Sequence, residues 1–177
     1  MIFFKKTDTS LYHQLRHRLK DLYLEAFTEG ISAQHIDEKD AEIYLNQCFS
    51  KGYGIFGFSD DKLIAALISI SPSLDTQRPQ TIQTKFIDDD TEYIAEVLVD
   101  QKFRGQGLGK KLIQFYEDNL SKFTKQVLLR VWDKNEAAVG LYKKFGFEKC
   151  GSITQKKLKP ISKESFEMHK IYMQKTY

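Results

Sequence analysis

A glycine-rich stretch near the middle of the chain has the residue types needed to bind an anion. Residues 104–110 read RGQGLGK, so three glycines alternate with other residues. Glycines let a ligand approach the backbone, and they allow the positive φ angles that aim successive N–H groups at one point. Arg104 and Lys110 add positive charge at the two ends of the stretch. This pattern predicts a site for a phosphate or pyrophosphate group.

The elements on either side of the glycines are expected to hold them in place. Residues 93–99, YIAEVLV, have the apolar and β-branched composition of a buried strand, interrupted by one acid, Glu96. After the glycines, Leu108, Leu112 and Phe115 fall on one helical face. The order is therefore strand, glycine loop and helix, and the first helical turn adds unpaired N–H donors and the positive end of its dipole.

Two common phosphate-binding motifs do not fit this stretch. A mononucleotide P-loop reads GxxxxGK[ST], but Gly109 and Lys110 are followed by Lys111, so the magnesium-binding hydroxyl is missing. A dinucleotide fingerprint reads GxGxxG, whereas every second residue is glycine here, and no acid for a ribose is obvious about 20 residues downstream. A loop whose glycines serve only to turn the chain is the remaining alternative.

The stretch resembles the acyl-CoA pyrophosphate loop of the GNAT superfamily of N-acyltransferases, which reads RxxGxG. Arg104, Gly107 and Gly109 match that motif. A second segment, residues 135–147, reads NEAAVGLYKKFGF and resembles the NxxAxxLYxxxGF helix of the same family. With the flanking elements, the resemblance spans nearly the whole chain. It implies acetyl-CoA as cosubstrate and direct attack of an amine on its thioester in a ternary complex.

The resemblance also implies which residues bind the cosubstrate. The backbone of residues 97–99 would pair with the pantetheine arm like an additional strand, and an N–H near Val97 could polarise the thioester carbonyl. Asn135 matches the asparagine that contacts the CoA arm, although an asparagine there would also suit a helix N-cap. The full predicted set is Val97, Leu98, Val99, Arg104, Gly105, Gln106, Gly107, Leu108, Gly109, Lys110, Asn135 and Tyr142.

Acetyl transfer needs a base for the amine and benefits from an acid for the departing thiolate. Glu96 is the candidate base, because burial in an apolar strand would raise its pKa toward a useful range. Glu92, Asp100 and an exposed amine that needs no side-chain base are alternatives, and Glu96 could instead be a structural carboxylate. By the resemblance, Tyr142 is the acid that points at the CoA sulfur, although its apolar helical stripe would also suit the core.

Size and composition predict one globular domain over residues 1–177. The chain is 41% hydrophobic and 29% charged, and its net charge of +3 is spread among interleaved acids and bases, so no nucleic-acid partner is expected. No run is long enough for a membrane span or a signal peptide, so we expect a cytoplasmic protein without a membrane partner. Two distant cysteines and a lone His13–His17 pair make no metal-binding signature, so no metal is expected.

Periodicity predicts an α/β fold with a mixed, mostly antiparallel central sheet and helices on both faces. The resemblance adds that the sheet is GNAT-like, with a splayed parallel strand pair that accommodates the thioester. Strands are predicted at 2–5, 52–58, 62–70, 93–99, 126–132, 147–158 and 165–173, with a possible short strand at 84–87. Helices are predicted through Leu11–Ala26, at about 37–50, after Gly107 and after Asn135.

The acceptor is specified only as a primary amine of a small molecule or peptide. Residues 88–90, DDD, would attract a cationic amine such as a polyamine, an aminoglycoside or a lysine, but acidic runs in loops are usually only solvated. Specificity is expected in the connections 28–36 and 71–90. Since many GNAT proteins dimerise, a homodimer is a possible assembly. The alternative functions are a CoA-binding regulatory module without turnover and a nucleotide-phosphate binder.

Overall fold

The computed structural model of the chain describes residues 1–86 and 88–177. Its strands are β1 (Ile2–Thr7), β2 (Gly52–Ser59), β3 (Lys62–Ile70), β4 (Thr91–Val99), β5 (Gln126–Trp132), β6 (Glu148–Leu158) and β7 (Ser165–Thr176). Its α-helices are α1 (Thr9–Thr28), α2 (Glu38–Ser50), α3 (Gln80–Gln83), α4 (Leu108–Asp118) and α5 (Glu136–Lys144), and short 3₁₀ helices lie at Pro72–Leu74 and Gln101–Phe103.

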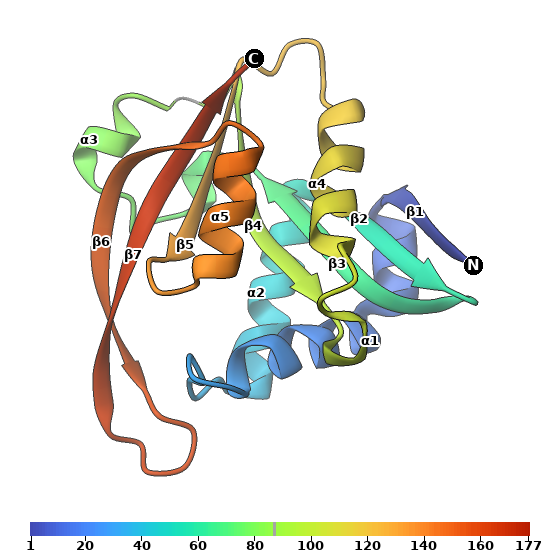
Figure 1. Cartoon of the computed structure of the whole chain (residues 1–177), viewed down its shortest axis with the longest axis horizontal. Coiled ribbons are helices and arrows are strands. Elements are labelled where there is room, and N and C mark those ends of the chain that lie inside the picture. The colour runs from blue at the N-terminus through green and yellow to red at the C-terminus, as the bar shows by residue number, and fades with distance from the viewer. Residues whose placement is uncertain (87) are drawn as a thin grey trace.

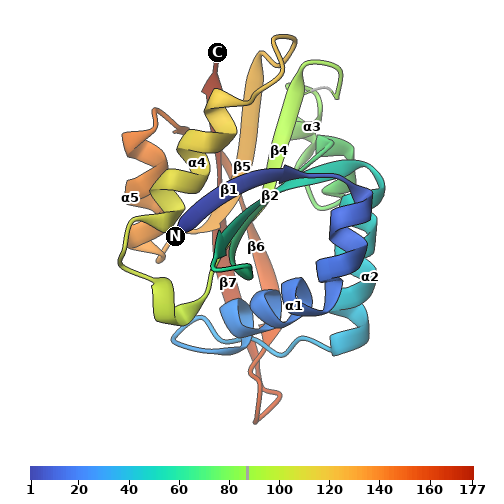
Figure 2. The ribbon, with the colours of Figure 1, turned by 90° about the vertical axis from the view of Figure 1, so that its right-hand side faces the viewer.

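All strands belong to one seven-stranded sheet in the order β1-β2-β3-β4-β5-β7-β6. Neighbouring strands are antiparallel except β4 and β5, which are parallel. Helices α1 and α2 cover one face of the sheet, and α4 and α5 cover the other (Figures 1 and 2). The predicted mixed, mostly antiparallel sheet with helices on both faces is confirmed.

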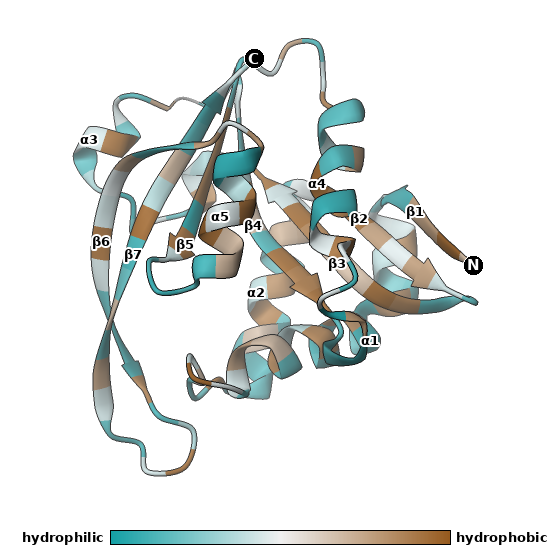
Figure 3. Ribbon diagram, in the orientation of Figure 1, coloured by the Kyte–Doolittle hydropathy of each residue, from teal (hydrophilic) through white to brown (hydrophobic). Residues whose placement is uncertain are grey.

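Each face of the sheet has its own hydrophobic core. Figure 3 shows hydrophobic segments along β3 and β4, each of which contributes side chains to both cores. The core under α1 and α2 includes Leu19, Leu22, Leu45, Phe56, Ile68, Tyr93, Leu98 and Tyr172. The core under α4 and α5 includes Ile55, Leu67, Ile94, Leu108, Leu112, Tyr116, Val127 and Leu129. Because side chains alternate along a strand, the residues at 93–95 of β4 contribute to the two cores in turn.

Local sequence signals explain where the helices begin. Asp8 caps α1 by accepting a hydrogen bond from the backbone N–H of Leu11, and Asp37 caps α2 through the N–H of Lys39. At the start of α4, Gly107 adopts the left-handed conformation. Among the described residues, no helix combines the length and hydrophobicity needed to span a membrane.

The possible short strand at 84–87 is wrong for its described part, Thr84 to Phe86. Residues 80–83 form α3, and Thr84 continues into a turn with its N–H bonded to the carbonyl of Gln80. The helix is favoured because Pro79 starts it and because Ile82 packs on Gly151 of β6. The last residue of the expected strand, position 87, lies outside the described residues.

Strand β4 has a β-bulge in the middle of its run. Two successive residues of β3, Ile68 and Ser69, pair with Glu96 and Ile94, which leaves Ala95 as an extra residue. A bulge breaks the alternation of side chains. Glu96 consequently lies on the α1–α2 side of the sheet, where Ala95 also packs.

The parallel pair separates after a short contact. β4 and β5 pair from Thr91 with Gln126 to Ile94 with Leu129, and the pairing ends there although β4 continues to Val99. The backbone of β4 beyond Ile94 is therefore paired with β3 on one side and not with β5 on the other. The gap between the strands lies beside Glu96, where the resemblance placed the thioester.

Candidate active site

A cavity of about 870 Å³ opens between the glycine loop, α4 and α5. From the predicted cofactor-binding set, it is lined by Val99, Arg104, Gly105, Gly107, Leu108, Gly109 and Lys110. The others, namely Val97, Leu98, Gln106, Asn135 and Tyr142, do not line it. The structure thus gathers the glycine loop and the end of β4 around one hollow, whose size is ordinary for a site that takes a cofactor.

The second wall of this cavity was missed by the sequence analysis. Glu136, Ala137, Gly140, Leu141 and Lys144 line it from α5. Their three- and four-residue spacing is the signal that could have identified them, because such residues share one helix face. The lining is completed by Phe103, Gln114, Glu117, Phe145 and Lys175.

The glycine loop needs glycine for its backbone conformation. Gly105 and Gly107 have φ angles of +75° and +76°, which side chains with a Cβ rarely adopt. Gly109 has a different task, since a Cβ there would lie 3.3 Å from a methyl carbon of Leu141, so its small size lets α4 approach α5. Arg104 Nε donates a 3.1 Å hydrogen bond to the Val99 carbonyl, which ties the loop to the end of β4.

Glu96 is half-buried on the opposite face of the sheet from this cavity. The Tyr44 hydroxyl of α2 donates a 2.8 Å hydrogen bond to its Oε1 atom. Burial raises the pKa of Glu96 to about 7, and the Tyr44 hydrogen bond and the charges of Lys170 and Arg130 limit that rise. The carboxyl group can therefore gain and lose a proton near neutral pH.

Glu92 is held by internal hydrogen bonds. It accepts from four hydroxyl groups, those of Tyr53, Ser69, Tyr116 and Thr124, at 2.6 to 3.0 Å. These hydrogen bonds join β2, β3, β4 and the region of α4 through one carboxylate. Its geometry suits a structural role better than proton transfer.

Asp100 is also engaged within the fold. Its Oδ2 atom lies 2.6 Å from the Arg18 guanidinium of α1, and its Oδ1 atom accepts from the backbone N–H of Lys102 at 3.0 Å. The pair joins α1 to the end of β4. Of the three acids considered from the sequence, Glu96 is thus the one with the fewest internal partners and a pKa near neutrality.

Tyr142 lies on α5 with its ring in the core. The ring packs edge-on against Phe147, with centroids 6.0 Å apart. Burial and the nearby charge of Glu96 raise the pKa of its phenol above the usual value, so the group keeps its proton at neutral pH. Within the described part of the chain the phenol oxygen has no hydrogen-bond partner, yet it is not among the oxygens fully shielded from solvent. It is a free donor near Glu96.

Asn135 performs the N-cap role that the sequence allowed. Its Oδ1 atom accepts a 3.2 Å hydrogen bond from the backbone N–H of Ala138, at the start of α5. The side chain is exposed, so this cap leaves its amide N–H groups available to a ligand.

The sheet face beside Glu96 carries ionisable residues that the sequence analysis missed. Arg130 of β5 binds both oxygens of Asp75, at 3.0 and 3.1 Å, and Asp75 also accepts from the Tyr172 hydroxyl at 2.7 Å. Lys170 of β7 and Lys157 of β6 are close enough to Glu96 for their charges to lower its pKa. Arg130, Lys157 and Lys170 each lie two or four residues along their strand from an inward apolar residue. This alternation is the sequence signal that could have identified them. Among the described residues, no group of His, Cys, Asp and Glu could hold a metal ion.

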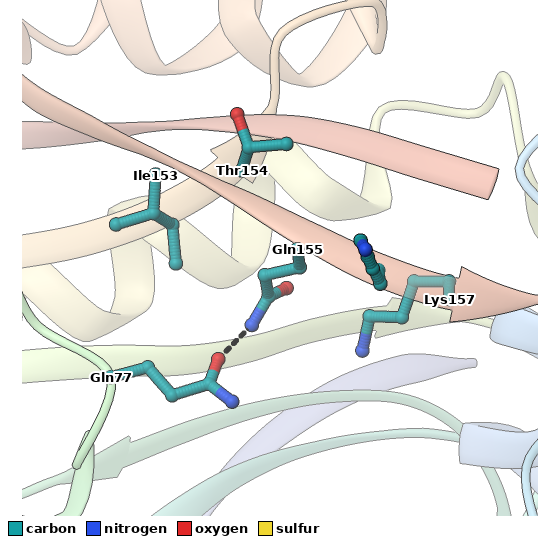
Figure 4. Close-up of a pocket in the computed structure, with 6 residues that line it drawn as sticks. Gln77, Ile153, Thr154, Gln155 and Lys157 are labelled. Carbon is teal, nitrogen blue, oxygen red and sulfur yellow. Dashed lines mark hydrogen bonds between the residues drawn. The ribbon is translucent and has the colours of Figure 1, made fainter. Parts of the chain in front are cut away.

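A second, smaller hollow of about 340 Å³ lies along β6 (Figure 4). Gln155 and Lys157 extend from β6 to the same side, toward Gln77 of the connection between β3 and β4. The Gln155 amide donates a hydrogen bond to the Gln77 side-chain oxygen. This connection was expected to contribute to specificity, and the structure places it against β6.

Comparisons with known proteins agree with the fold. A sequence model of the Acetyltransferase (GNAT) family matches residues 16–147. A curated relative, the spermine/spermidine N(1)-acetyltransferase of Bacillus subtilis (strain 168), is 29% identical over 63 residues, which span 34% of this chain and 41% of that protein. The chain therefore aligns with less than half of this relative's length.

Two solved structures share the fold across nearly the whole chain. The ribosomal-protein-alanine N-acetyltransferase from Brucella melitensis superposes with a TM-score of 0.69 at 16% identity and 99% coverage of both chains. A putative acetyltransferase from Salmonella typhimurium, solved with its cofactor acetyl-CoA, has a TM-score of 0.68 at 13% identity, covering 99% of this chain and 94% of that one. Since the family match covers most of the sequence, this chain belongs to the GNAT family of acetyltransferases.

Proposed function

We propose that the protein is an N-acetyltransferase that moves an acetyl group from acetyl-CoA to a primary amine of a small molecule or peptide. The observation that carries this proposal is the gap between β4 and β5. The glycine-loop cavity lies on one side of the sheet there, and Glu96, with a pKa of about 7, lies on the other. We further propose that residues 1–177 form a single acetyltransferase domain, because all the strands belong to one sheet.

The glycine loop would hold the pyrophosphate of acetyl-CoA, which supplies the acetyl group as an activated thioester. The N–H groups of the first turn of α4 point away from that helix, and the charges of Arg104 and Lys110 lie at the same cavity. The unpaired edge of β4 at residues 97–99 would hydrogen-bond the pantetheine arm as a further strand. Asn135 would add an amide contact to that arm.

The proton transfers fall to the two groups that flank the gap. Glu96 would accept a proton from the acceptor amine, directly or through a water, as the amine attacks the thioester carbonyl. Tyr142 would donate its phenol proton to the departing thiolate. The pKa values suit this division, because Glu96 ionises near pH 7 whereas the pKa of Tyr142 is raised, so that it stays protonated.

The relatives do not identify the acceptor. One is named for spermine and spermidine and another for the alanine of a ribosomal protein, so the same fold serves different amines. The side chains around Glu96 in this chain must therefore determine which amine is accepted.

The test is thermal unfolding with acetyl-CoA, CoA, ATP and NAD in parallel. A ligand that binds only the folded protein raises the midpoint, so we expect shifts with acetyl-CoA and CoA and none with ATP or NAD. A shift with ATP or NAD alone would contradict the proposal and indicate a nucleotide-phosphate binder. A shift with acetyl-CoA but no thiol release with a broad set of amines would indicate a CoA-binding module without turnover.

A further inference from the structure

We propose that the acceptor amine also carries a carboxylate or phosphate group, which Lys157 and Lys170 bind on the sheet face beside Glu96. This inference rests on the proposed acetyl transfer, because Glu96 marks where the amine would lose its proton. It narrows the acceptor from any primary amine to amines that bear a negative charge elsewhere in the molecule.

The two lysines lie on β6 and β7, beyond the gap between β4 and β5. They face the same side of the sheet as Glu96. Lys170 of β7 pairs with Ile153 of β6, and from Ile153 the alternating residues Gln155 and Lys157 continue along the same face. Ile153 packs against the core under α1 and α2, the same side on which Glu96 bonds to α2. The ammonium groups and the carboxyl group therefore converge on one side of the sheet.

Both lysines lack a negative partner. Each is half-buried, and neither forms a salt bridge with any residue in 1–86 or 88–177. Arg130, the third cation of this face, is already neutralised by Asp75. A partly buried charge without a partner is costly for the fold, and sites that bind charged ligands are where such a cost is retained.

The electrostatics of the two ammonium groups support a bound anion. Burial lowers the pKa of Lys170 to about 8, and the neighbouring charges of Lys157 and Arg130 add to the effect. Burial and Arg130 likewise lower the pKa of Lys157. Glu96 acts in the opposite direction on both, but its own pKa near 7 leaves it only partly ionised at neutral pH. The face therefore has an excess of positive charge, which an anionic group would neutralise.

Two glutamines complete a polar hollow of about 340 Å³ next to Lys157. The Gln155 Oε1 atom is shielded from solvent and accepts no hydrogen bond from a described residue. Buried oxygens of this kind normally have a donor, and the described residues that line the hollow supply none. The side-chain amide of Gln77, which accepts from Gln155, presents N–H donors for the oxygens of an anion.

The same charges disfavour a polyamine. A second or third ammonium group placed beyond Glu96 would meet Lys157 and Lys170, and like charges at short range exclude a ligand. Two of the three acids in the 88–90 run are engaged elsewhere, because Asp88 accepts from the backbone N–H of Ser73 and Asp90 pairs with Lys125. The negative charge of residues 88–90, which could attract a cationic amine, is therefore not the main charge beside Glu96.

The experiment compares amines that differ only in the anionic group. Thiol release from acetyl-CoA is measured with β-alanine against propylamine, phenylalanine against phenethylamine, phosphoethanolamine against ethanolamine, and with spermidine. We expect kcat/KM to be about tenfold or more higher for the anionic member of a pair. The carboxylate and phosphate pairs separate the two sources of the charge.

Variants link the preference to the two lysines. Lys157→Met and Lys170→Met should each lower the ratio of kcat/KM for the anionic amine to that for its neutral partner by about tenfold. Lys149→Met removes the same charge from an exposed position of β6 and should leave the ratio unchanged. A ratio that is equally reduced by Lys149→Met would contradict the assignment.

Three results would overturn the inference or its basis. Equal or higher kcat/KM for spermidine or for the neutral amines would overturn it while leaving the acetyltransferase proposal intact. No turnover of any anionic amine by a protein that acetyl-CoA still protects from heat would also overturn it. If acetyl-CoA gives no protection, the proposed function itself fails, and the acceptor inference falls with it.

Discussion

Glu96 combines a place beside the strand gap with a carboxyl group that titrates near neutral pH. Its pKa of about 7 results mainly from burial, and Tyr44 is its hydrogen-bond donor in the fold. Glu92, four residues earlier on the same strand, is surrounded by hydroxyl donors instead. Two glutamates of one strand thus have different environments, one suited to a structural role and the other to the proposed role of proton acceptor.

Replacing Glu96 should change the pH dependence of catalysis. Only the ionised carboxylate accepts a proton, so wild-type kcat/KM should rise with pH through about 7. Glu96→Gln should lower kcat about 100-fold and remove this limb of the profile. Tyr44→Phe removes a hydrogen bond that favours the ionised form, and should move the inflection to higher pH. A profile that is unchanged in Glu96→Gln would assign the base role to water or another acid.

The same substitution should alter stability in a pH-dependent way. The pKa of Glu96 is raised from 4.5 to about 7 on folding, so the stabilisation present below pH 4.5 is lost as the pH rises through 7. Glu96→Gln has no such loss. The free energy of unfolding of the variant, relative to that of wild type, should therefore increase from pH 4.5 to 7 and stay constant at higher pH. This increase in the free energy of unfolding is at most about 3 kcal/mol, and solvent screening makes it smaller. Urea unfolding at pH 4.5 and 8 measures it, and parallel pH dependence in both proteins would contradict it.

Tyr142 should matter for turnover and not for binding or packing. Tyr142→Phe keeps the ring that packs on Phe147 and removes a phenol with no partner among the described residues. We expect kcat to fall about 10- to 100-fold while the thermal shift with acetyl-CoA stays the same. Single-turnover thiol release and thermal unfolding measure the two effects. Unchanged turnover in Tyr142→Phe would show that Tyr142 has only a structural role.

At the scale of elements, strand β4, the glycine loop and α4 act as one unit. The Asp100 carboxylate anchors the strand end to α1, the Arg104 bond to Val99 ties the loop to the strand, and Gly109 brings α4 against α5. The loop is thus fixed at both ends. A ligand that binds it meets donors whose positions are set before binding, which lowers the entropic cost of association.

Gly107→Val tests this unit. The substitution forces a β-branched residue to a φ angle of +76° at the first turn of α4, which costs about 1–3 kcal/mol and moves the N–H groups of the loop. We expect acetyl-CoA to lose its thermal shift. Gly30→Val is the matched control, because Gly30 has a φ angle of +79°, also has open space at its Cβ, and lies outside the cavity. The control should lose similar stability and keep the shift; retention of the shift by Gly107→Val would refute the loop assignment.

At the scale of the whole molecule, the connection between β3 and β4 is attached to β5 and β7, across the gap between β4 and β5. Asp75 in this connection accepts from Arg130 of β5 and from Tyr172 of β7. Because this contact neutralises Arg130, Lys157 and Lys170 remain as the cations near Glu96 that have no salt bridge among the described residues. The buried Asp75 carboxylate therefore has two effects. It holds the connection against β5 and β7, and it neutralises one of the three cations near Glu96.

Asp75→Asn should destabilise the whole fold. The change leaves the half-buried Arg130 without its counter-charge, and we expect a loss of about 1–3 kcal/mol in the free energy of unfolding. The urea midpoint should fall with an unchanged slope. Asp89→Asn removes a charge from an exposed position of the same connection and should have little effect. Equal midpoints for the two variants would show that the Asp75 contact does not stabilise the fold.

The sequence by itself determined the family, the order of the elements and the place of the glycine loop proposed to bind an anion. These features are local: a glycine spacing, a helical stripe and an apolar strand are each written within about a dozen residues. Residues 104–110 and the strand before them predicted a phosphate site at the glycine loop, which lines one wall of the cavity, and the NxxAxxLYxxxGF match predicted the helix α5. The one local error, a strand in place of α3, arose in a connection whose helix depends on packing against Gly151.

Only the tertiary structure decided how the acids and bases are used. The bulge at Ala95 depends on pairing with β3, and it turns Glu96 toward Tyr44, which lies 52 residues away in sequence. Lys157 and Lys170 face Glu96 because β6 and β7 fold back beside β5. Strand register and the twist of the sheet arise from contacts between residues distant in sequence, so no local pattern contains them. The positive charge proposed to select the acceptor is therefore a property of the folded sheet.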